Sequence, residues 1–291
     1  MEKNNKIKKI LVLSFEAGSA EIISNYLINK KKKNYIFILN DVTKKIFKKN
    51  KCFFKLASKK IYNYNIKKIF FGAGYNHDEI NIIKKNKLEK CKTICFLDHW
   101  VFYKHRFTVN GKVFSPNKII TSDKYAYSAI KKIKFNKTKF QIIKNPLLFQ
   151  IQNNIKKQQR TNKKIIIFLN NITFNNPSKK VRYYINNKQL IHFALTYLKK
   201  NYNKKIDKVY IKLHPSNNYH EYKKNLIKFK RISIIKEDDI GKVLSQAKLV
   251  ICNEGMPLYL SHFLGIKNLN ITNNKPPQIP KQLCNEILNI K

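Results

Sequence analysis

The stretch Thr93-Ile-Cys-Phe-Leu-Asp-His-Trp-Val-Phe-Tyr-Lys-His-Arg-Phe107 joins a short apolar run to a cluster of reactive side chains. The run from Thr93 to Leu97 predicts a buried strand. In an open α/β sheet, ligands bind just beyond the carboxyl ends of the strands. The stretch therefore predicts one wall of an active site, although a capped helix with packed aromatic side chains would use the same residue types. Its candidate site residues are Asp98, His99, Trp100, Tyr103, His105 and Arg106.

Short apolar runs alternate with helical segments over the whole chain. The runs cover residues 9–15, 34–39, 67–71, 93–97, 118–121 and 140–144, and then 164–169, 208–213, 231–235, 248–252 and 268–271. This alternation predicts parallel sheets with helices on both faces. A polar segment without apolar periodicity, residues 150–162, predicts a linker between the two series. We therefore predict two Rossmann-like α/β domains, residues 1–150 and 163–291, whose sheets face each other across a cleft.

The turn after the first predicted strand carries Glu16, Gly18 and Ser19. Small residues at the start of a helix let a ligand approach the free N–H groups of the first turn, which attract anions. Ordinary turn chemistry explains a single glycine equally well. We count these three residues as candidate substrate contacts because they lie on the same predicted sheet edge as Asp98.

The chain has 291 residues and a formal net charge of +45, which would usually indicate a polyanionic partner. The lysines are spread over the whole length together with many Asn and Ile residues, which indicates a compositional bias. Because the sequence carries no nucleic-acid-binding signature, we expect no specific nucleic acid partner. The charge favours phosphate-bearing ligands and is compatible with peripheral contact with an anionic inner membrane.

The five cysteines have no pairing framework, which suits a reducing compartment, and their spacing does not form a metal site. The sequence also lacks an Asp-x-Asp metal motif. The N-terminus has no apolar signal-peptide core, and no apolar run approaches the length of a membrane span. We therefore expect a cytoplasmic protein that uses no metal.

Two motifs in the second half resemble a known family. They are Ile211-Lys-Leu-His-Pro215 and Val250-Ile-Cys-Asn-Glu-Gly-Met-Pro-Leu-Tyr-Leu-Ser-His-Phe-Leu-Gly-Ile266. Both are similar to the donor half of GT-B glycosyltransferases, most of all to the sialyltransferase-like and CDP-glycerol glycerophosphotransferase-like groups that build bacterial surface polymers. Asn145-Pro-Leu-Leu-Phe149 also resembles the junction that closes the first domain in such proteins.

The resemblance implies a metal-independent transfer of a sugar from a nucleotide-activated donor to a glycan or lipid-linked acceptor, without a further cofactor. His214 would stabilise the leaving phosphate, and Pro215 would hold the turn that aims it. The segment Asn253, Glu254, Gly255 and Met256 would meet the phosphate or the ribose, with Glu254 accepting from ribose hydroxyls. The family commonly has Ser-Ser at this segment, so CMP-, CDP- and UDP-linked donors all remain open.

The first predicted domain would then activate the acceptor hydroxyl. Asp98 and His99 are the leading base candidates, with Glu16 and the pair His77-Asp78 in reserve. The basic side chains Lys104, His105 and Arg106 would hold an acidic acceptor or a phosphate, and the aromatic side chains Trp100, Phe102 and Tyr103 would stack on a sugar.

Two alternatives stay open. A UDP-sugar 2-epimerase-like enzyme of the same architecture ranks second, because such enzymes are usually richer in acids and arginines around the site. A non-catalytic basic protein that binds polyanions or membranes through its lysines ranks last, because the core-forming sequence gives it no site.

Overall fold

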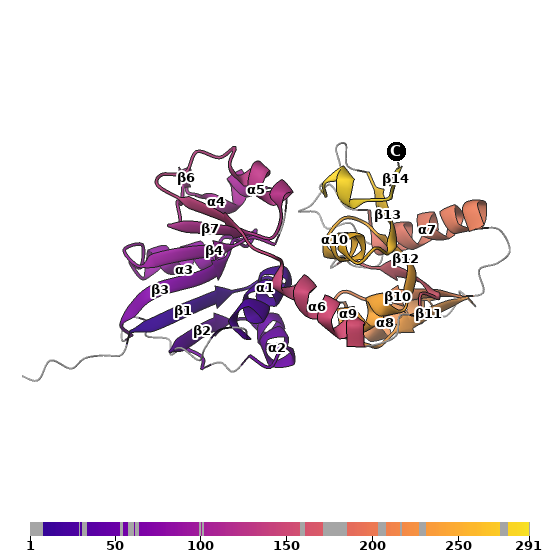
Figure 1. The fold of residues 1–291 in the computed structure, drawn as a ribbon, viewed down its shortest axis with the longest axis horizontal. Coiled ribbons are helices and arrows are strands. Elements are labelled where there is room, and N and C mark those ends of the chain that lie inside the picture. Colours follow the sequence, from indigo (N-terminus) through magenta and orange to yellow (C-terminus); the bar gives the residue numbers. More distant parts are fainter. Residues whose placement is uncertain are drawn as a thin grey trace, which may run out of the picture. The chain divides into compact units, whose positions relative to one another are not determined.

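Strands and helices alternate along the chain and fold into two units, Met1–Gln150 and Ile151–Lys291 (Figure 1). The computed structural model describes residues 8–28, 30, 34–52, 55–57, 61, 64–98, 100, 102–157, 161–170, 185–202, 208–215, 217–226, 231–273 and 279–290. Each unit is an α/β domain built on its own six-stranded parallel sheet, which confirms the predicted fold class.

Unit 1 has the strand order β2-β1-β3-β4-β7-β8, and all of these strand pairs are parallel. Its sheet strands are β1 (Lys9–Ser14), β2 (Tyr35–Leu39), β3 (Ile66–Gly72), β4 (Lys92–Phe96), β7 (Lys118–Thr121) and β8 (Lys139–Ile142). Its helices are α1 (Ala17–Ile28), α2 (Asp41–Lys49), α3 (Asp78–Lys85), α4 (Tyr103–Phe107) and α5 (Lys124–Ile130), and β5 (Thr108–Val109) and β6 (Lys112–Val113) form a small hairpin.

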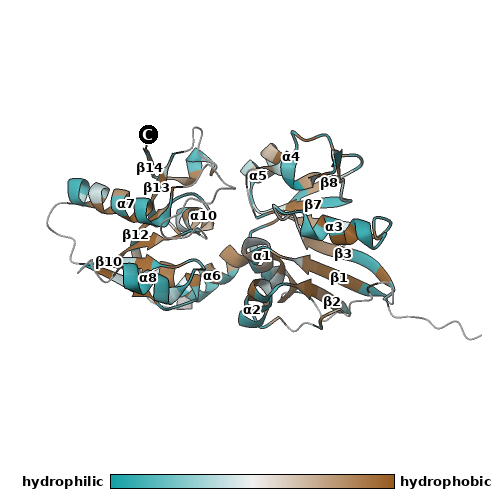
Figure 2. Cartoon of the chain, turned by 180° about the vertical axis from the view of Figure 1, so that it is seen from behind, coloured by the Kyte–Doolittle hydropathy of each residue, from teal (hydrophilic) through white to brown (hydrophobic). Residues whose placement is uncertain are grey.

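Successive residues of the central strands alternate between two apolar clusters, one on each face of the sheet. Leu11 and Leu13 belong to one cluster, and Val12 between them belongs to the other. Strands β1 and β2 are accordingly hydrophobic along most of their length (Figure 2). Helices that cover both faces of a parallel sheet leave only its two edges for polar chemistry.

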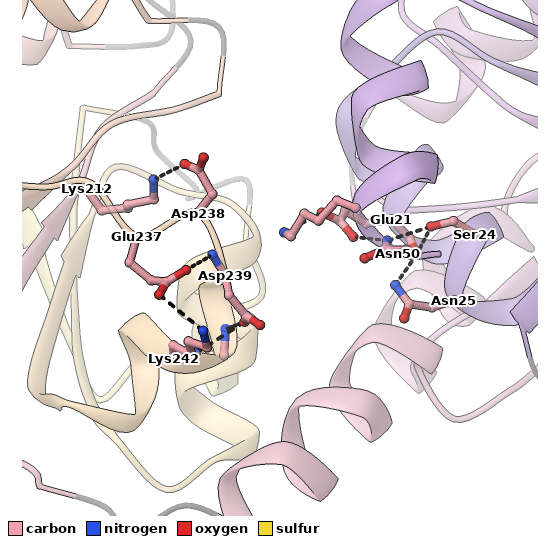
Figure 3. Close-up of polar contacts among 11 residues, drawn as sticks. Glu21, Ser24, Asn25, Asn50, Lys212, Glu237, Asp238, Asp239 and Lys242 are labelled. Atoms are coloured by element: carbon pink, nitrogen blue, oxygen red, sulfur yellow. Dashed lines mark hydrogen bonds and ion pairs between the residues drawn. The ribbon is translucent and has the colours of Figure 1, made fainter. Parts of the chain in front are cut away.

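A polar contact fixes α1, whose N-terminus belongs to the site described below. Asn50, directly after α2, donates from its side-chain nitrogen to Glu21 Oε2 at 2.7 Å and to Ser24 Oγ at 2.8 Å (Figure 3). Both acceptors lie on α1, so the two helices that pack on this face are joined by hydrogen bonds as well as by apolar contacts.

Unit 2 has the strand order β11-β10-β9-β12-β13-β14, again with parallel pairs throughout. Its strands are β9 (Lys164–Phe168), β10 (Val209–Lys212), β11 (Ile232–Ile235), β12 (Ala247–Cys252), β13 (Lys267–Thr272) and β14 (Glu286–Asn289). Its helices are α7 (Asn187–Tyr202), α8 (Tyr219–Leu226), α9 (Ile240–Ser245), α10 (Met256–Phe263) and the 3-10 turn η3 (Lys281–Leu283).

Two sequence predictions are wrong. A helix, α6 (Pro146–Lys157), occupies most of the predicted linker and buries Ile151 and Ile155. Its start carries the usual signals, because Asn145 Oδ1 accepts from the N–H groups of Leu147 and Leu148, and Pro146 is the first helical residue. The residues after the proline-rich segment 275–280 predict a short terminal helix, but the structure has β14 here, which pairs with β13. The segment 170–180 is rich in Asn, Thr, Ser and Pro and predicts a loop, but it lies almost wholly outside the described residues.

No helix within the described ranges is long and apolar enough to cross a membrane.

Candidate active site

The carboxyl edge of the unit 1 sheet collects most of the buried acidic side chains of that unit. Strands β1, β3, β4 and β7 are neighbours in the parallel sheet, so the segments that follow them meet at one edge. The buried acidic residues of these segments are Glu79, Asp98 and Asp123, and Glu16 is partly exposed. A chain with only 16 acidic residues thus places several of them together, partly out of water.

Asp98 lies against the first turn of α1. The side chain is 6% exposed. A Cβ atom added to Gly18 would stand only 1.9 Å from Asp98 Oδ2, so the carboxylate occupies the space that a larger residue would need. The N-terminus of a helix favours negative charge. Asp98 and Gly18, which the sequence predicts as site residues, are therefore brought together, and the role of Gly18 is to admit the carboxylate.

Glu16 and Arg106 form an ion pair across 90 positions of sequence. Arg106 Nη1 donates to Glu16 Oε2 at 3.1 Å and to the carbonyl oxygen of Ala73 at 2.6 Å. Glu16 Oε1 accepts from the backbone N–H of Tyr75 at 2.6 Å. Arg106 is 5% exposed, so its guanidinium serves this internal network, and the prediction that it holds an acidic acceptor does not fit its placement.

Glu79 was not singled out from the sequence, although it lies at the centre of this edge. Its Oε1 accepts from the N–H of Phe15 at 3.1 Å, and its Oε2 accepts from the N–H of Gly74 at 3.3 Å. Burial, together with the charge of Glu16, raises the pKa of Glu79 to about 8. One signal was present in the sequence: Glu79 precedes the buried Ile83 by four residues and so shares its helix face.

Ser19 and Tyr103 are internal. Ser19 Oγ lies 2.9 Å from Ser14 Oγ and 3.0 Å from the carbonyl oxygen of Glu16, beneath Gly72. Tyr103 belongs to the apolar core of unit 1. Neither side chain is placed to contact a ligand, which corrects the predicted substrate contacts at both positions.

Trp100 is partly exposed and held by Asp123. Its indole Nε1 donates to Asp123 Oδ2 at 2.9 Å, while Asp123 Oδ1 accepts from the N–H groups of Tyr125 and Ala126 and caps α5. The sequence predicts Ser122 or Asp123 as the cap of this helix, and the structure has Asp123 in that role. His99, which the sequence pairs with Asp98 as a base, lies outside the described residues.

Of the aromatic side chains predicted to stack on a sugar, Phe102 instead belongs to a cluster of rings with Tyr75, His77 and His105. The rings of Tyr75 and His105 lie 4.4 Å apart, those of His77 and His105 lie 4.7 Å apart, and Phe102 packs edge-on to Tyr75. His77 and Phe102 both adopt a left-handed backbone conformation, with φ of 63° and 59°. Such conformations are strained for non-glycine residues and persist where the surrounding structure fixes them.

His214 follows β10 at the carboxyl edge of the unit 2 sheet, as the sequence predicts, and its backbone N–H donates to Asn217 Oδ1 at 2.9 Å. Burial and, to a smaller extent, Lys212 lower the pKa of His214 to about 4. Lys212 is itself paired with Asp238 at 3.3 Å (Figure 3). The imidazole is therefore neutral near pH 7 and can act as an N–H donor, not as a cation; Pro215 beside it is exposed.

The segment from Asn253 to Met256 forms the tight exit from β12 into α10. Gly255 has a φ of 99°, which favours glycine, and Glu254 before it has a φ of 59°. Asn253 is fully buried: its Nδ2 donates to the carbonyl oxygen of Ile271, and its Oδ1 accepts from Asn170. Met256 begins α10, so the free N–H groups of that helix face this exit.

Glu254 does not fit its predicted role at a ribose. The side chain is buried, and its Oε2 accepts from the backbone N–H of Ile279 at 2.7 Å. Its backbone N–H donates to Asn270 Oδ1 at 3.0 Å. Glu254 therefore holds the β12 exit to neighbouring parts of unit 2.

Amides, not acids, dominate the unit 2 edge. Asn187 Nδ2 donates to the carbonyl oxygen of Asn170 and to the Tyr222 hydroxyl at 2.6 Å, and Asn170 Nδ2 donates to Asn253. Two buried polar atoms here, Asn270 Nδ2 and Glu254 Oε1, have no hydrogen-bond partner among the residues that the structure describes. An amide-rich edge at a helix N-terminus is compatible with an anionic or hydroxyl-rich ligand.

Within the described part of the chain, no group of three or more His, Cys, Asp or Glu side chains could hold a metal ion.

The chain matches no protein-family model and no curated protein. Several solved structures share its fold. The UDP-GlcNAc 2-epimerase of Methanocaldococcus jannaschii in complex with UDP-GlcNAc and UDP superposes with a TM-score of 0.68 at 12% identity, over 97% of this chain and 89% of that one. The enzyme of the same name from Neisseria meningitidis, bound to UDP-GlcNAc, gives 0.60 at 10% identity over 90% and 82%. The one from Rickettsia bellii gives 0.58 at 12% identity over 94% and 81%.

At these identities the likeness establishes the fold. The chain has the two-domain, GT-B-like α/β fold that its motifs imply, and the narrower resemblance to sialyltransferase-like and CDP-glycerol-type enzymes stays a prediction.

Proposed function

We propose that this protein is an enzyme of the UDP-sugar 2-epimerase type, which acts on the sugar of a nucleotide-activated sugar. The observation that carries the proposal is the acidic edge of unit 1, where Asp98, Glu16 and Glu79 gather with Arg106. From the sequence alone, an epimerase ranked second because few acids and arginines were evident around the site. The fold removes that objection, because it collects these residues from distant segments. The shared fold with three UDP-GlcNAc 2-epimerases supports the same choice.

The chemistry of an epimerase requires groups that exchange protons with a carbon centre. Inversion at a carbon that bears hydrogen, when its C–H bond breaks, needs one group that removes the proton and one that returns a proton to the other face. Asp98 is our candidate for the base, because it lies at the sheet edge beside a helix N-terminus. In this proposal, unit 2 binds the nucleotide through His214 and the N-terminus of α10.

The test uses the full chain, UDP-N-acetylglucosamine and D2O, with no acceptor. We expect a second epimer and incorporation of solvent deuterium into the sugar, followed by NMR and mass spectrometry. Asp98→Asn should abolish both signals, whereas Asp41→Asn, which changes an exposed carboxylate on α2, should keep them. Unchanged substrate with the wild-type chain at high protein concentration would contradict the proposal.

One observation favours the glycosyltransferase predicted from the motifs as a second candidate. His214 is a neutral N–H donor at the end of β10, which suits the stabilisation of a leaving nucleoside phosphate. This enzyme would release nucleotide only when a glycan or lipid-linked acceptor is present, and it would leave the donor unchanged in the acceptor-free experiment. A thermal-shift screen with CMP, CDP, UDP and GDP would identify the nucleotide in either case, because a ligand that binds the folded state raises its stability.

A further inference from the structure

The buried carboxyl group of Glu79 connects two turns that the sequence places far apart. Glu79 lies in the first turn of α3 and is 1% exposed. One of its oxygens accepts from Phe15, in the turn after β1, and the other accepts from Gly74, in the turn after β3. Both bonds use backbone N–H groups, so the side chain acts on the course of the two turns themselves.

The same two turns carry the ion pair of the site. Glu16 follows Phe15 directly, and its carboxylate accepts from the N–H of Tyr75, the residue after Gly74. Arg106, from α4, donates to Glu16 and to the carbonyl oxygen of Ala73. Glu79 and the Glu16–Arg106 pair therefore hold the same two turns together.

We propose that Glu79 is a positioning residue of the unit 1 site: its buried carboxyl group holds the turn after β1 against the turn after β3 and thereby fixes Glu16 and Arg106 at the sheet edge. The importance of this role for catalysis rests on the proposed function, whereas the positional role stands without it.

The turn after β3 packs closely against this carboxyl group. A Cβ atom at Gly74 would stand 2.8 Å from Glu79 Oε2, and one at Gly72 would stand 2.3 Å from Ser19 Cβ. Glycines at both positions bring the β3 exit close enough for the bond from Gly74 to form. The fit is specific to a carboxyl group, because a Gln at this position would turn its NH2 group toward one of two N–H donors.

The electrostatic surroundings of Glu79 supply a direct readout. Its pKa is raised to about 8 by burial and by the charge of Glu16. The other charged or titratable groups of this cluster are the Cys95 thiol on β4, Asp98 after β4 and Arg106 on α4. Ionisation of Glu79 adds a second negative charge beside Glu16 in a nearly water-free place, so it should repel the Glu16 carboxylate, although the N–H groups of Phe15 and Gly74 favour the ionised form.

The experiment is an NMR titration of the substrate-free full chain, labelled with 13C at the glutamate carboxyl carbons and with 15N. We expect one glutamate signal to titrate near pH 8, and the Tyr75 amide and the Arg106 guanidinium signals to shift with the same midpoint. Glu79→Gln should remove this titration and displace both reporters already at neutral pH. Asp78→Asn, which changes the exposed acid next to Glu79 in the same helix turn, should leave them in place.

Two results would overturn the proposal. One is a Glu79 signal that titrates while the Tyr75 and Arg106 signals stay constant. The other is a folded Glu79→Gln variant whose Tyr75 and Arg106 signals match those of the wild type. If that variant does not fold, the wild-type titration alone decides.

Enzyme kinetics provide a second, independent test. If the wild type converts a UDP-sugar, we expect Glu79→Gln to lower kcat about tenfold or more with a smaller change in KM, and to remove the inflection near pH 8 from the pH–rate profile. Absence of turnover in the wild type would count against the proposed function only, because the NMR arm needs no substrate.

Discussion

Substitution of Gly18 by Ala tests how Asp98 is held at the sheet edge. Gly18 lies in the first turn of α1 and does not have the positive φ that excludes other residues. Its backbone therefore accepts alanine, and any loss must come from the space around it. The new Cβ atom would stand 1.9 Å from Asp98 Oδ2, whereas an ordinary contact needs at least 3.4 Å, so the carboxylate has to move by about 1.5 Å.

The expected energies have opposite signs. Overpacking of a buried site costs about 1–3 kcal/mol. Displacement of a carboxylate from a helix N-terminus costs a further 0.3–2 kcal/mol, approximately. Alanine in a helix gains about 0.5–1 kcal/mol over glycine. We expect a net loss of about 1–3 kcal/mol in the free energy of unfolding and, under the proposed function, a loss of about 100-fold in kcat/KM, because displacements near 1 Å have that effect on reacting groups.

A double-mutant cycle measured by urea unfolding isolates the contact. In the Asp98→Ala background the obstructing side chain is gone, so Gly18→Ala should stabilise the protein by about 0.5–1 kcal/mol. The coupling energy between the two positions should then reach about 2–3 kcal/mol. A Gly18→Ala variant as stable as the wild type, or the same loss in both backgrounds, would refute the assigned contact.

Three further predictions concern stability and nucleotide binding. Because the pKa of Glu79 is raised from 4.5 to about 8, its contribution to stability is fully present below pH 4.5 and is lost as the pH rises to 8. Over this range the free energy of unfolding, measured with urea, should fall by up to about 1.4 kcal/mol per pH unit more in the wild type than in Glu79→Gln. Parallel curves for the two proteins would contradict the burial of this group. Asn268→Ala should destabilise unit 2 by about 2–4 kcal/mol, because the side chain makes several buried hydrogen bonds. Its Nδ2 donates to Leu258, Ser261 and Leu283, and its Oδ1 accepts from Asn285. The control Asn201→Ala changes an exposed residue and should keep the free energy of unfolding within about 0.5 kcal/mol of the wild-type value. His214→Ala should lower the affinity for the best-bound nucleotide about tenfold in calorimetry, and His214→Gln should lower it less. Because the pKa of His214 is about 4, the wild-type affinity should show no step from this residue between pH 5.5 and 8. A step in this range that both variants lose would show that the imidazole binds the nucleotide as a cation.

Local signals in the sequence predicted most of the elements and some of the site. Apolar runs at the right spacing predict eleven of the twelve sheet strands, which is enough to fix the two-domain α/β fold, and only the terminal β14 lacks such a run. The segment of α6 was misread because Gln150, Gln152 and Asn153 obscure the spacing of Ile151 and Ile155, although Asn145 and Pro146 already mark a helix start.

The sequence predicted the location of the site better than the individual side chains that form it. Asp98, Gly18, Glu16 and Arg106 do meet at one sheet edge, as expected of residues that follow neighbouring parallel strands. The prediction failed where it depended on side-chain direction. Tyr103 and Glu254 follow strands as predicted, but they turn inward, because the left-handed residues Phe102 and Glu254 reverse the local course of the chain.

The sequence by itself determined the alternation of strands and helices, because burial of apolar side chains at regular spacing is a local property of the chain. Only the tertiary structure decided which polar groups act together. The order β2-β1-β3-β4 places Glu16, Glu79, Asp98 and Arg106 side by side, although they are separated by up to 90 positions. Strand order and turn conformation arise from long-range pairing, so the burial that raises the pKa of Glu79 could not be predicted from its neighbours in sequence.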